Sequence, residues 1–186
     1  MIKLFVLRHA QTDSDVQDRT LGTLDWPLNK MGLKEIKRFA TKLKASKTKF
    51  DLIIASPLKR TFDSANIIGE ALNVPVITDK LIIERNFGEL QGLTWEEFCE
   101  KYPELIPGNE KYYQTNLPSA EPRESVVTRV KQFLQKIHAN YDGKAILVVT
   151  STGIIRIMKC ELLGISPEES RKGLIPNLEL IKFTLK

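Results

Sequence analysis

Five short stretches of the chain have the pattern of β-strands. Apolar runs cover residues 2–7, 51–56, 74–78 and 145–150, and residues 178–185 alternate between apolar and polar side chains. Runs of four to eight apolar or alternating residues have the length of a strand. The runs over 51–56 and 145–150 read as buried strands, 74–78 reads as a short strand, and the last stretch reads as an alternating strand.

Helical patterns lie between these strands. After residue 30, apolar residues recur at the three- and four-residue spacing of an amphipathic helix, and Asn29 is a suitable cap at its start. Pro57 predicts the opening of the next helix, because proline's fixed φ and missing N–H suit a first helical turn. Two further helices are predicted over residues 125–140 and 154–163.

This alternation of strands and helices predicts the fold class. Strand–helix repeats are typical of a mostly parallel sheet with helices on both faces, so we expect a three-layer α/β/α architecture. A length of 186 residues fits one domain over residues 1–186. Residues 81–121 are less regular and rich in glycine and proline, which indicates an inserted lobe with one short helix near 94–101. Such lobes commonly cover a functional site.

Composition and charge narrow the class of protein. The two cysteines, Cys99 and Cys160, favour neither a disulfide framework nor a cysteine metal site. No stretch has the length of a membrane span or the pattern of a signal peptide, so we expect a cytoplasmic protein that does not bind membranes. The net charge of +5 is concentrated in residues 34–49, where Phe39 is the single aromatic residue. This segment therefore predicts a solvated helix face and not a nucleic-acid site.

Candidate chemistry follows three of the predicted strands. Arg8 and His9 end the first, residues 56–60 follow the second, and residues 150–153 follow the fourth. Ligands of such folds bind at the carboxyl ends of the strands, so these three loops are expected to converge on one pocket. A neutral imidazole can attack phosphorus, and arginine forks bind phosphate oxygens. Arg8, Arg60 and Arg19 are the candidate hydrogen-bond donors to the phosphate oxygens.

Several motifs in order along the chain resemble those of one family. RHAQT resembles the Arg-His-Gly signature of the histidine phosphatase superfamily, the phosphoglycerate mutase-like family, with Ala10 in place of glycine. The other similar segments are DRTLGTLDWPLNKMG (18–32), ASPLKRTFDSA (55–65), LIIERNFGELQGLTWEE (81–97), PRESVVTRV (122–130) and VVTSTGIIR (148–156). Their order and spread make the resemblance far more specific than any one motif.

The resemblance implies a fold and a set of roles. The fold would be phosphoglycerate mutase-like, His9 the nucleophile and Glu84 the acid and base. A salt bridge from Glu84 to Arg85 or Lys80 is the structural alternative for that residue. Arg8 and Arg60 would bind the phosphoryl group, with Asp15, Arg19, Ser151 and Thr152 also at the phosphate site. No metal or cofactor is implied, because arginines take the place of a metal ion.

Two further positions depart from the family pattern. Asp15 stands where the family has asparagine, and a carboxylate near a phosphate repels it unless it points elsewhere. Ser151 stands where the loop normally has its second pocket histidine. A hydroxyl is a shorter, uncharged donor, and loss of one such preorganised donor costs about 10²–10³ in rate. A divergent weak phosphatase, a non-catalytic phosphate-binding relative and a laboratory substitution all fit this difference.

The sequence therefore predicts an enzyme, a phosphomonoester hydrolase that works through a phosphohistidine on His9 and is weakened by Ser151. A phosphoglycerate mutase-type phosphotransferase and an impaired phosphate-binding regulatory protein are the alternatives. The predicted partner is a small phosphate ester. The identity of that ester and the oligomeric state, a dimer included, stay open.

Overall fold

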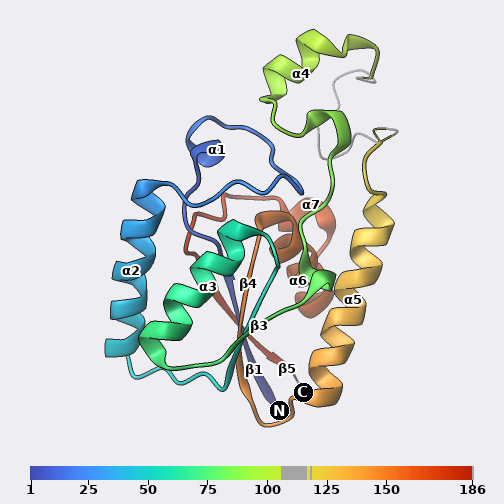
Figure 1. The fold of residues 1–186 in the computed structure, drawn as a ribbon. Coiled ribbons are helices and arrows are strands. Elements are labelled where there is room, and N and C mark those ends of the chain that lie inside the picture. Colours follow the sequence, from blue (N-terminus) through green and yellow to red (C-terminus); the bar gives the residue numbers. More distant parts are fainter. Residues whose placement is uncertain (106–116, 118, 186) are drawn as a thin grey trace.

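The computed structural model describes residues 1–105, 117 and 119–185, and a five-stranded sheet forms its centre (Figure 1). The strand order is β3-β2-β4-β1-β5, and only β5 runs antiparallel, beside β1. The strands are β1 (Ile2–Arg8), β2 (Leu52–Ala55), β3 (Val76–Thr78), β4 (Ala145–Thr150) and β5 (Leu180–Leu185). The predicted mostly parallel sheet is confirmed.

Helices cover both faces of this sheet (Figure 1). On one face, α2 (Lys30–Ala45) and α3 (Lys59–Leu72) pack on alternate strand residues such as Ile53 and Leu147. On the other face, α5 (Arg123–Asn140) and α6 (Thr152–Leu163) pack on their neighbours, such as Ile54 and Val148. Because successive strand residues point to opposite faces, these apolar runs supply two cores and three layers, as the sequence predicts.

The sequence pattern predicted the start of one helix correctly and the starts of three others with an error of two residues. Asn29 caps α2, and its Oδ1 accepts a hydrogen bond from the Gly32 amide at 2.8 Å, as expected. In contrast, α3 begins two residues after Pro57, because Leu58 has extended backbone and serves as its N-cap. α5 and α6 each begin two residues before the predicted start, where polar residues and a glycine form the first turn and carry no apolar signal.

The segment between β3 and α5 holds short elements. These are η1 (Lys80–Ile82), η2 (Gly88–Leu90), α4 (Trp95–Lys101) and η3 (Pro103–Leu105). α4 lies away from the sheet (Figure 1), and its buried Phe98 packs in a small cluster with Leu90 and Leu117. Residues 106–116 and 118 of the expected lobe lie outside the described residues. The single-domain organisation and the cytoplasmic location stay predictions.

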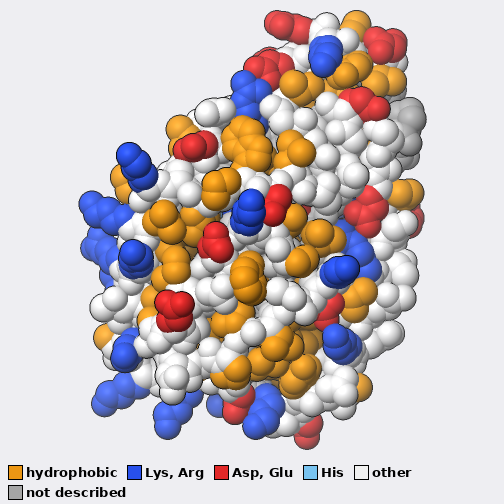
Figure 2. Space-filling view, in the orientation of Figure 1, with side chains coloured by type: hydrophobic (Ala, Val, Ile, Leu, Met, Phe, Trp, Pro, Cys, Tyr) orange, Lys and Arg blue, Asp and Glu red, His pale blue; other side chains and the backbone are white. Residues whose placement is uncertain are grey.

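The basic segment forms the outer face of α2. Its lysines, such as Lys34 and Lys37, are exposed, and Figure 2 shows Lys and Arg side chains along the edge of the molecule that α2 occupies in Figure 1. No helix in the described ranges is long and apolar enough to span a membrane.

Strand register brings the candidate loops together. In the parallel pair β1–β4, Arg8 lies opposite Thr150, and the His9 amide donates to the Thr150 carbonyl at 3.1 Å. On the other side of β4, the Ser56 amide donates to the Val149 carbonyl at 3.0 Å. The loops after β1, β2 and β4 therefore leave the sheet side by side. Two short helices flank them, α1 (Asp13–Val16) after β1 and α7 (Pro167–Ser170) after α6.

Candidate active site

A cavity of about 290 Å³ lies at this edge of the sheet. All eight residues that the sequence singled out are in its lining. Three of these are arginines, and four further arginines bring the arginines in the lining to seven. The eight are Arg8, His9, Asp15, Arg19, Arg60, Glu84, Ser151 and Thr152, and the seven arginines are Arg8, Arg19, Arg60, Arg85, Arg123, Arg156 and Arg171. Such a cavity is small and strongly cationic.

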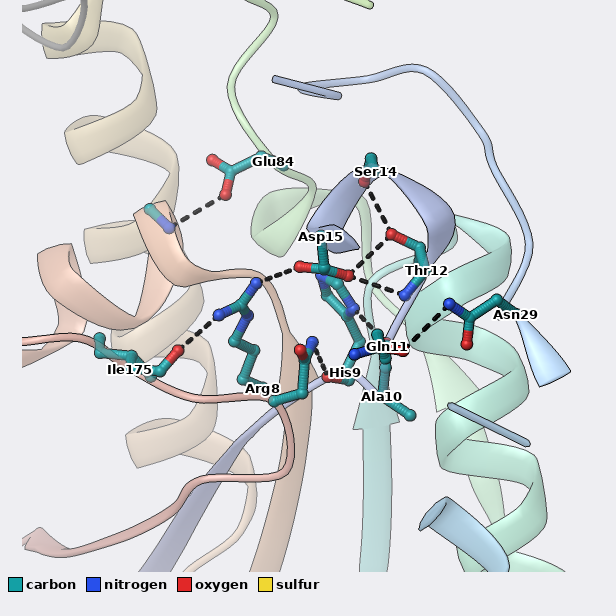
Figure 3. A network of polar contacts seen from close by, with 12 residues as sticks. Arg8, His9, Ala10, Gln11, Thr12, Ser14, Asp15, Asn29, Glu84 and Ile175 are labelled. Carbon is teal, nitrogen blue, oxygen red and sulfur yellow. Dashed lines mark hydrogen bonds and ion pairs between the residues drawn. The ribbon is translucent and has the colours of Figure 1, made fainter. Parts of the chain in front are cut away.

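His9 is held in one tautomer. Its ring is buried, and Nδ1 lies 2.8 Å from the Ala10 carbonyl oxygen (Figure 3). A carbonyl oxygen only accepts, so Nδ1 carries the proton and Nε2 keeps its lone pair. Burial, with the charge of Arg60, lowers the pKa of His9 to about 3, although Asp15 opposes that shift. The imidazole is therefore neutral near pH 7 and chemically able to act as a nucleophile.

Arg60 reaches the cavity from the first turn of α3. Its Nη1 donates to the Leu24 carbonyl at 2.8 Å, and Nη2 donates to the Gly22 carbonyl at 2.7 Å. Gly22 has a φ of +55°, and a Cβ there would lie 2.7 Å from the Arg85 carbonyl oxygen. Glycine is needed at that position because of both the backbone conformation and the close approach. These two carbonyls fix the guanidinium of Arg60, a residue that is 2 % exposed.

Arg8 is fixed from two sides. Its Nη1 donates to the Ile175 carbonyl at 2.6 Å, and its Nη2 forms an ion pair with Asp15 (Figure 3). The Asp15 carboxylate also accepts from the amide of Thr12 at 2.8 Å and from its hydroxyl at 2.7 Å. Burial raises the pKa of Asp15, but His9, Arg8 and the Thr12 bonds outweigh burial, so its pKa lies below the usual value. Asp15 therefore points toward Arg8 as an anion.

Glu84 lies against the start of α6. Its Oε2 accepts from the Gly153 amide at 3.0 Å, and its Oε1 accepts from its neighbour's amide, Arg85 N, at 2.8 Å. A Cβ on residue 153 would lie 2.5 Å from Glu84 Oε1, so only glycine permits this approach. Among the described residues, Glu84 forms no ion pair with Lys80 or with the Arg85 side chain. The salt-bridge alternative is thus not observed.

Ser151 is the N-cap residue of α6. Its side chain does not cap the helix, and its buried Oγ has no hydrogen-bond partner within the described chain. A buried hydroxyl without a partner is costly, and a bound ligand oxygen in the adjoining cavity would satisfy it. Thr152 follows as the first residue of α6 and also lines the cavity.

Arg19 differs from the other two arginines. It lines the same cavity, but its Nη1 donates to the Gly92 carbonyl at 2.8 Å and its Nη2 donates to Glu97 Oε1 at 2.8 Å. Glu97 also belongs to the capping box of α4. Arg19 therefore joins the loop after β1 to α4, and much of its donor capacity is used there.

Sequence reasoning missed several lining residues. Arg85, Arg123, Arg156 and Arg171 line the cavity although the motifs gave them no binding role. Arg85 could have been found as the neighbour of Glu84. Arg123 carries a different signal, a cation at the opening of a helix, where acidic residues are usual.

The arrangement combines a neutral imidazole, fixed guanidinium groups and a buried carboxyl group. Together these groups can bind a tetrahedral anion, attack it and move a proton. The described residues contain no cluster of three or more His, Cys, Asp or Glu side chains suited to a metal ion.

Comparisons with known proteins agree with this chemistry. Residues 4–186 match the Histidine phosphatase superfamily (branch 1). Phosphoserine phosphatase 1 of Hydrogenobacter thermophilus is 37% identical over 166 residues, covering 89% of this chain and 78% of that protein. The 2,3-bisphosphoglycerate-dependent phosphoglycerate mutase of Bifidobacterium longum is 31% identical over 203 residues, covering 94% and 82%. A solved mycobacterial glucosyl-3-phosphoglycerate phosphatase complex with VO3 has a TM-score of 0.80 and 25% identity, covering 97% of this chain and 90% of that one.

Proposed function

Because the chain belongs to the histidine phosphatase superfamily, we propose that it hydrolyses phosphate monoesters through a phosphohistidine on His9. One observation carries the proposal. The Ala10 carbonyl holds the proton on Nδ1 of a neutral ring, so Nε2 is the nitrogen with a free electron pair. The ring lines the same cavity as the buried Arg60 guanidinium, which can bind the phosphoryl oxygens.

The reaction has two steps. In the first, His9 Nε2 attacks phosphorus, the ester P–O bond breaks, and Glu84 gives its proton to the departing alcohol. In the second, Glu84 takes a proton from water, the water oxygen attacks phosphorus, and the P–N bond breaks to release phosphate. Arg8 and Arg60 neutralise the phosphoryl oxygens throughout, which is the electrostatic stabilisation that phosphoryl transfer needs.

Ser151 would weaken this reaction. Its hydroxyl reaches less far than an imidazole and carries no charge, so it stabilises the transferring group less. Its unpartnered Oγ favours a second candidate function, a phosphate-binding protein with little turnover. A hydrolase is preferred to a mutase because the segment 81–121, which we expect to form a lobe, is short in sequence, and a mutase must exclude water while its intermediate turns round.

Trapping the intermediate tests the nucleophile. The wild-type protein, His9→Asn and His138→Asn would be mixed with a ³²P-labelled phosphate ester and quenched within milliseconds. We expect an acid-labile, base-stable label on the wild type and on His138→Asn, and none on His9→Asn. His138 lies exposed near the end of α5 and is the matched control. Label on His9→Asn would overturn the proposal.

Product analysis tests the reaction class. With p-nitrophenyl phosphate and with 3-phosphoglycerate, a hydrolase releases inorganic phosphate in step with loss of the ester. A mutase converts 3-phosphoglycerate to its isomer with little phosphate released. Binding of phosphate without turnover of either ester would favour the second candidate.

A further inference from the structure

A second group of arginines lines the same cavity as Arg8 and Arg60. It consists of Arg85, Arg123, Arg156 and Arg171, which come from four different segments of the chain. The acidic residues in the lining are Asp15, Asp18 and Glu84. Asp15 is paired with Arg8, and Glu84 is held by backbone amides, so neither side chain neutralises this region by direct pairing.

Arg123 stands where helix stability does not require it. It is the first residue of α5, and the partial positive charge at a helix N-terminus disfavours a cation there. It forms no hydrogen bond or ion pair with any described residue. A half-buried arginine in an unfavourable position, facing a cavity, is best explained by an anion that enters the cavity.

Arg85 places a second guanidinium near the first. It is buried, its Nε donates to the Glu121 carbonyl at 2.8 Å, and its guanidinium lies over the Phe87 ring. The Glu121 carboxylate is bound by Arg129 at 2.9 and 3.1 Å. Burial lowers the pKa of Arg85, nearby Glu121 opposes that shift, and Arg123 lowers the pKa further. Glu124 and Glu84 also raise the pKa of Arg85, so the repulsion between the two arginines is offset in part, and an anion bound beside them would offset it further.

Arg156 approaches the same region from α6. Its Nη2 donates to the Gly173 carbonyl at 3.3 Å, and its buried Nε has no partner in the portion that the structure describes. The cavity lining also includes Val126, Ile157 and Cys160, which are apolar or weakly polar. Guanidinium donors and apolar side chains in one cavity suit a small charged group on a short carbon chain.

We infer that Arg123, together with Arg85 and Arg156, forms a second anion subsite that selects phosphate monoesters carrying a further carboxylate or phosphate group. The inference rests on the proposed function, because it assigns the far end of the same substrate. The first phosphate would lie at His9 and Arg60, and the second anion would lie at the start of α5. Arg123 acts here as a specificity-determining residue.

Matched ester pairs test this subsite. 3-Phosphoglycerate and glycerol 3-phosphate differ by the carboxylate, and fructose 1,6-bisphosphate and fructose 6-phosphate differ by a second phosphate. In at least one pair, we expect wild-type kcat/KM to be about tenfold to hundredfold higher for the ester that carries the second anionic group. This factor corresponds to one charge-assisted bidentate contact. The pair with the larger preference identifies the anion as carboxylate or phosphate.

Two variants locate the preference. Arg123→Gln should lower the preference ratio toward one, whereas the control Arg38→Gln, on the exposed face of α2, should leave the ratio unchanged. Arg123→Lys should restore part of the ratio, because lysine keeps the charge but not the fork. A wild-type ratio near one for both pairs, or an Arg123→Gln ratio equal to that of wild type, would overturn the inference.

Binding separates failure of the subsite from failure of the proposed function. Titration calorimetry on His9→Asn, which cannot form the phosphohistidine, compares the dissociation constants of the same pairs. A preference that Arg123→Gln removes in this background supports the subsite even where no ester is hydrolysed. Turnover of p-nitrophenyl phosphate without any preference for a second anion would contradict the subsite and would not contradict the proposed function.

Discussion

Arg8, the last residue of β1, forms an ion pair with Asp15 of α1, and the same carboxylate accepts two hydrogen bonds from Thr12. The pair fixes the Arg8 guanidinium and also brings a negative charge to the edge of a site that we propose binds a phosphate. Asp15 thus orders the loop while opposing the anion. Coulomb repulsion at such short range in a partly buried site is several times stronger than in bulk water.

Substitution of Asp15 should tighten anion binding. In Asp15→Asn, the amide oxygen can still accept from Thr12, but the negative charge is gone and Arg8 is released toward the ligand. We expect the inhibition constant of inorganic phosphate to fall about tenfold, which corresponds to roughly 1.4 kcal/mol. Competition against p-nitrophenyl phosphate measures it.

The control for that change lies on the same short helix. Asp13 is exposed and makes no ion pair with a described residue. Asp13→Asn therefore removes the same charge as Asp15→Asn without breaking the Arg8 ion pair. An equal fall in both variants would mean that general charge, and not the Arg8 pair, sets phosphate affinity.

Ser151→His should raise turnover. The buried Ser151 Oγ is unpartnered and adjoins the cavity, which offers room for a ring. A second imidazole can donate to the transferring phosphoryl oxygens, so we expect kcat for p-nitrophenyl phosphate to rise by about 10²–10³. Steady-state kinetics measure the gain, and His9→Asn/Ser151→His should abolish it. An absence of activity in both the wild-type protein and Ser151→His would favour the phosphate-binding role.

The sequence predicted the fold more completely than it predicted the environment of the site. Apolar runs and caps such as Asn29 act through local spacing, so strands, helices and the edge where loops meet could be read directly. The Arg19–Glu97 pair and the contact of Gly153 with Glu84 join residues far apart in sequence, and local patterns do not encode such distances. Arg123 was missed because its meaning depends on the cavity beside it.

Gly153→Ala should disturb the proposed acid. A Cβ at residue 153 would lie 2.5 Å from Glu84 Oε1, so the carboxyl group must move. Alkyl phosphates need a proton on their leaving group, whereas p-nitrophenolate leaves without one. We therefore expect kcat to fall about tenfold to hundredfold for glycerol 3-phosphate and much less for p-nitrophenyl phosphate. Glu84→Gln should show the same leaving-group dependence, and an equal loss for both esters would contradict it.

The buried His9 should make folding stability depend on pH. Burial, with the charge of Arg60, lowers the folded-state pKa of His9 from 6.5 to about 3. Between these values the unfolded chain binds one proton more than the folded chain, so the free energy of unfolding rises with pH by about 1.4 kcal/mol per unit and this contribution levels off above 6.5. Urea unfolding between about pH 4.5 and 6 measures the slope above the range in which Asp15 titrates. His9→Asn should lose about one proton of that slope, whereas His138→Asn, in which the buried ring is intact, should keep it. A slope that is unchanged in His9→Asn would mean that the ring binds its proton equally in the folded and unfolded chains over this range, which would contradict the lowered pKa.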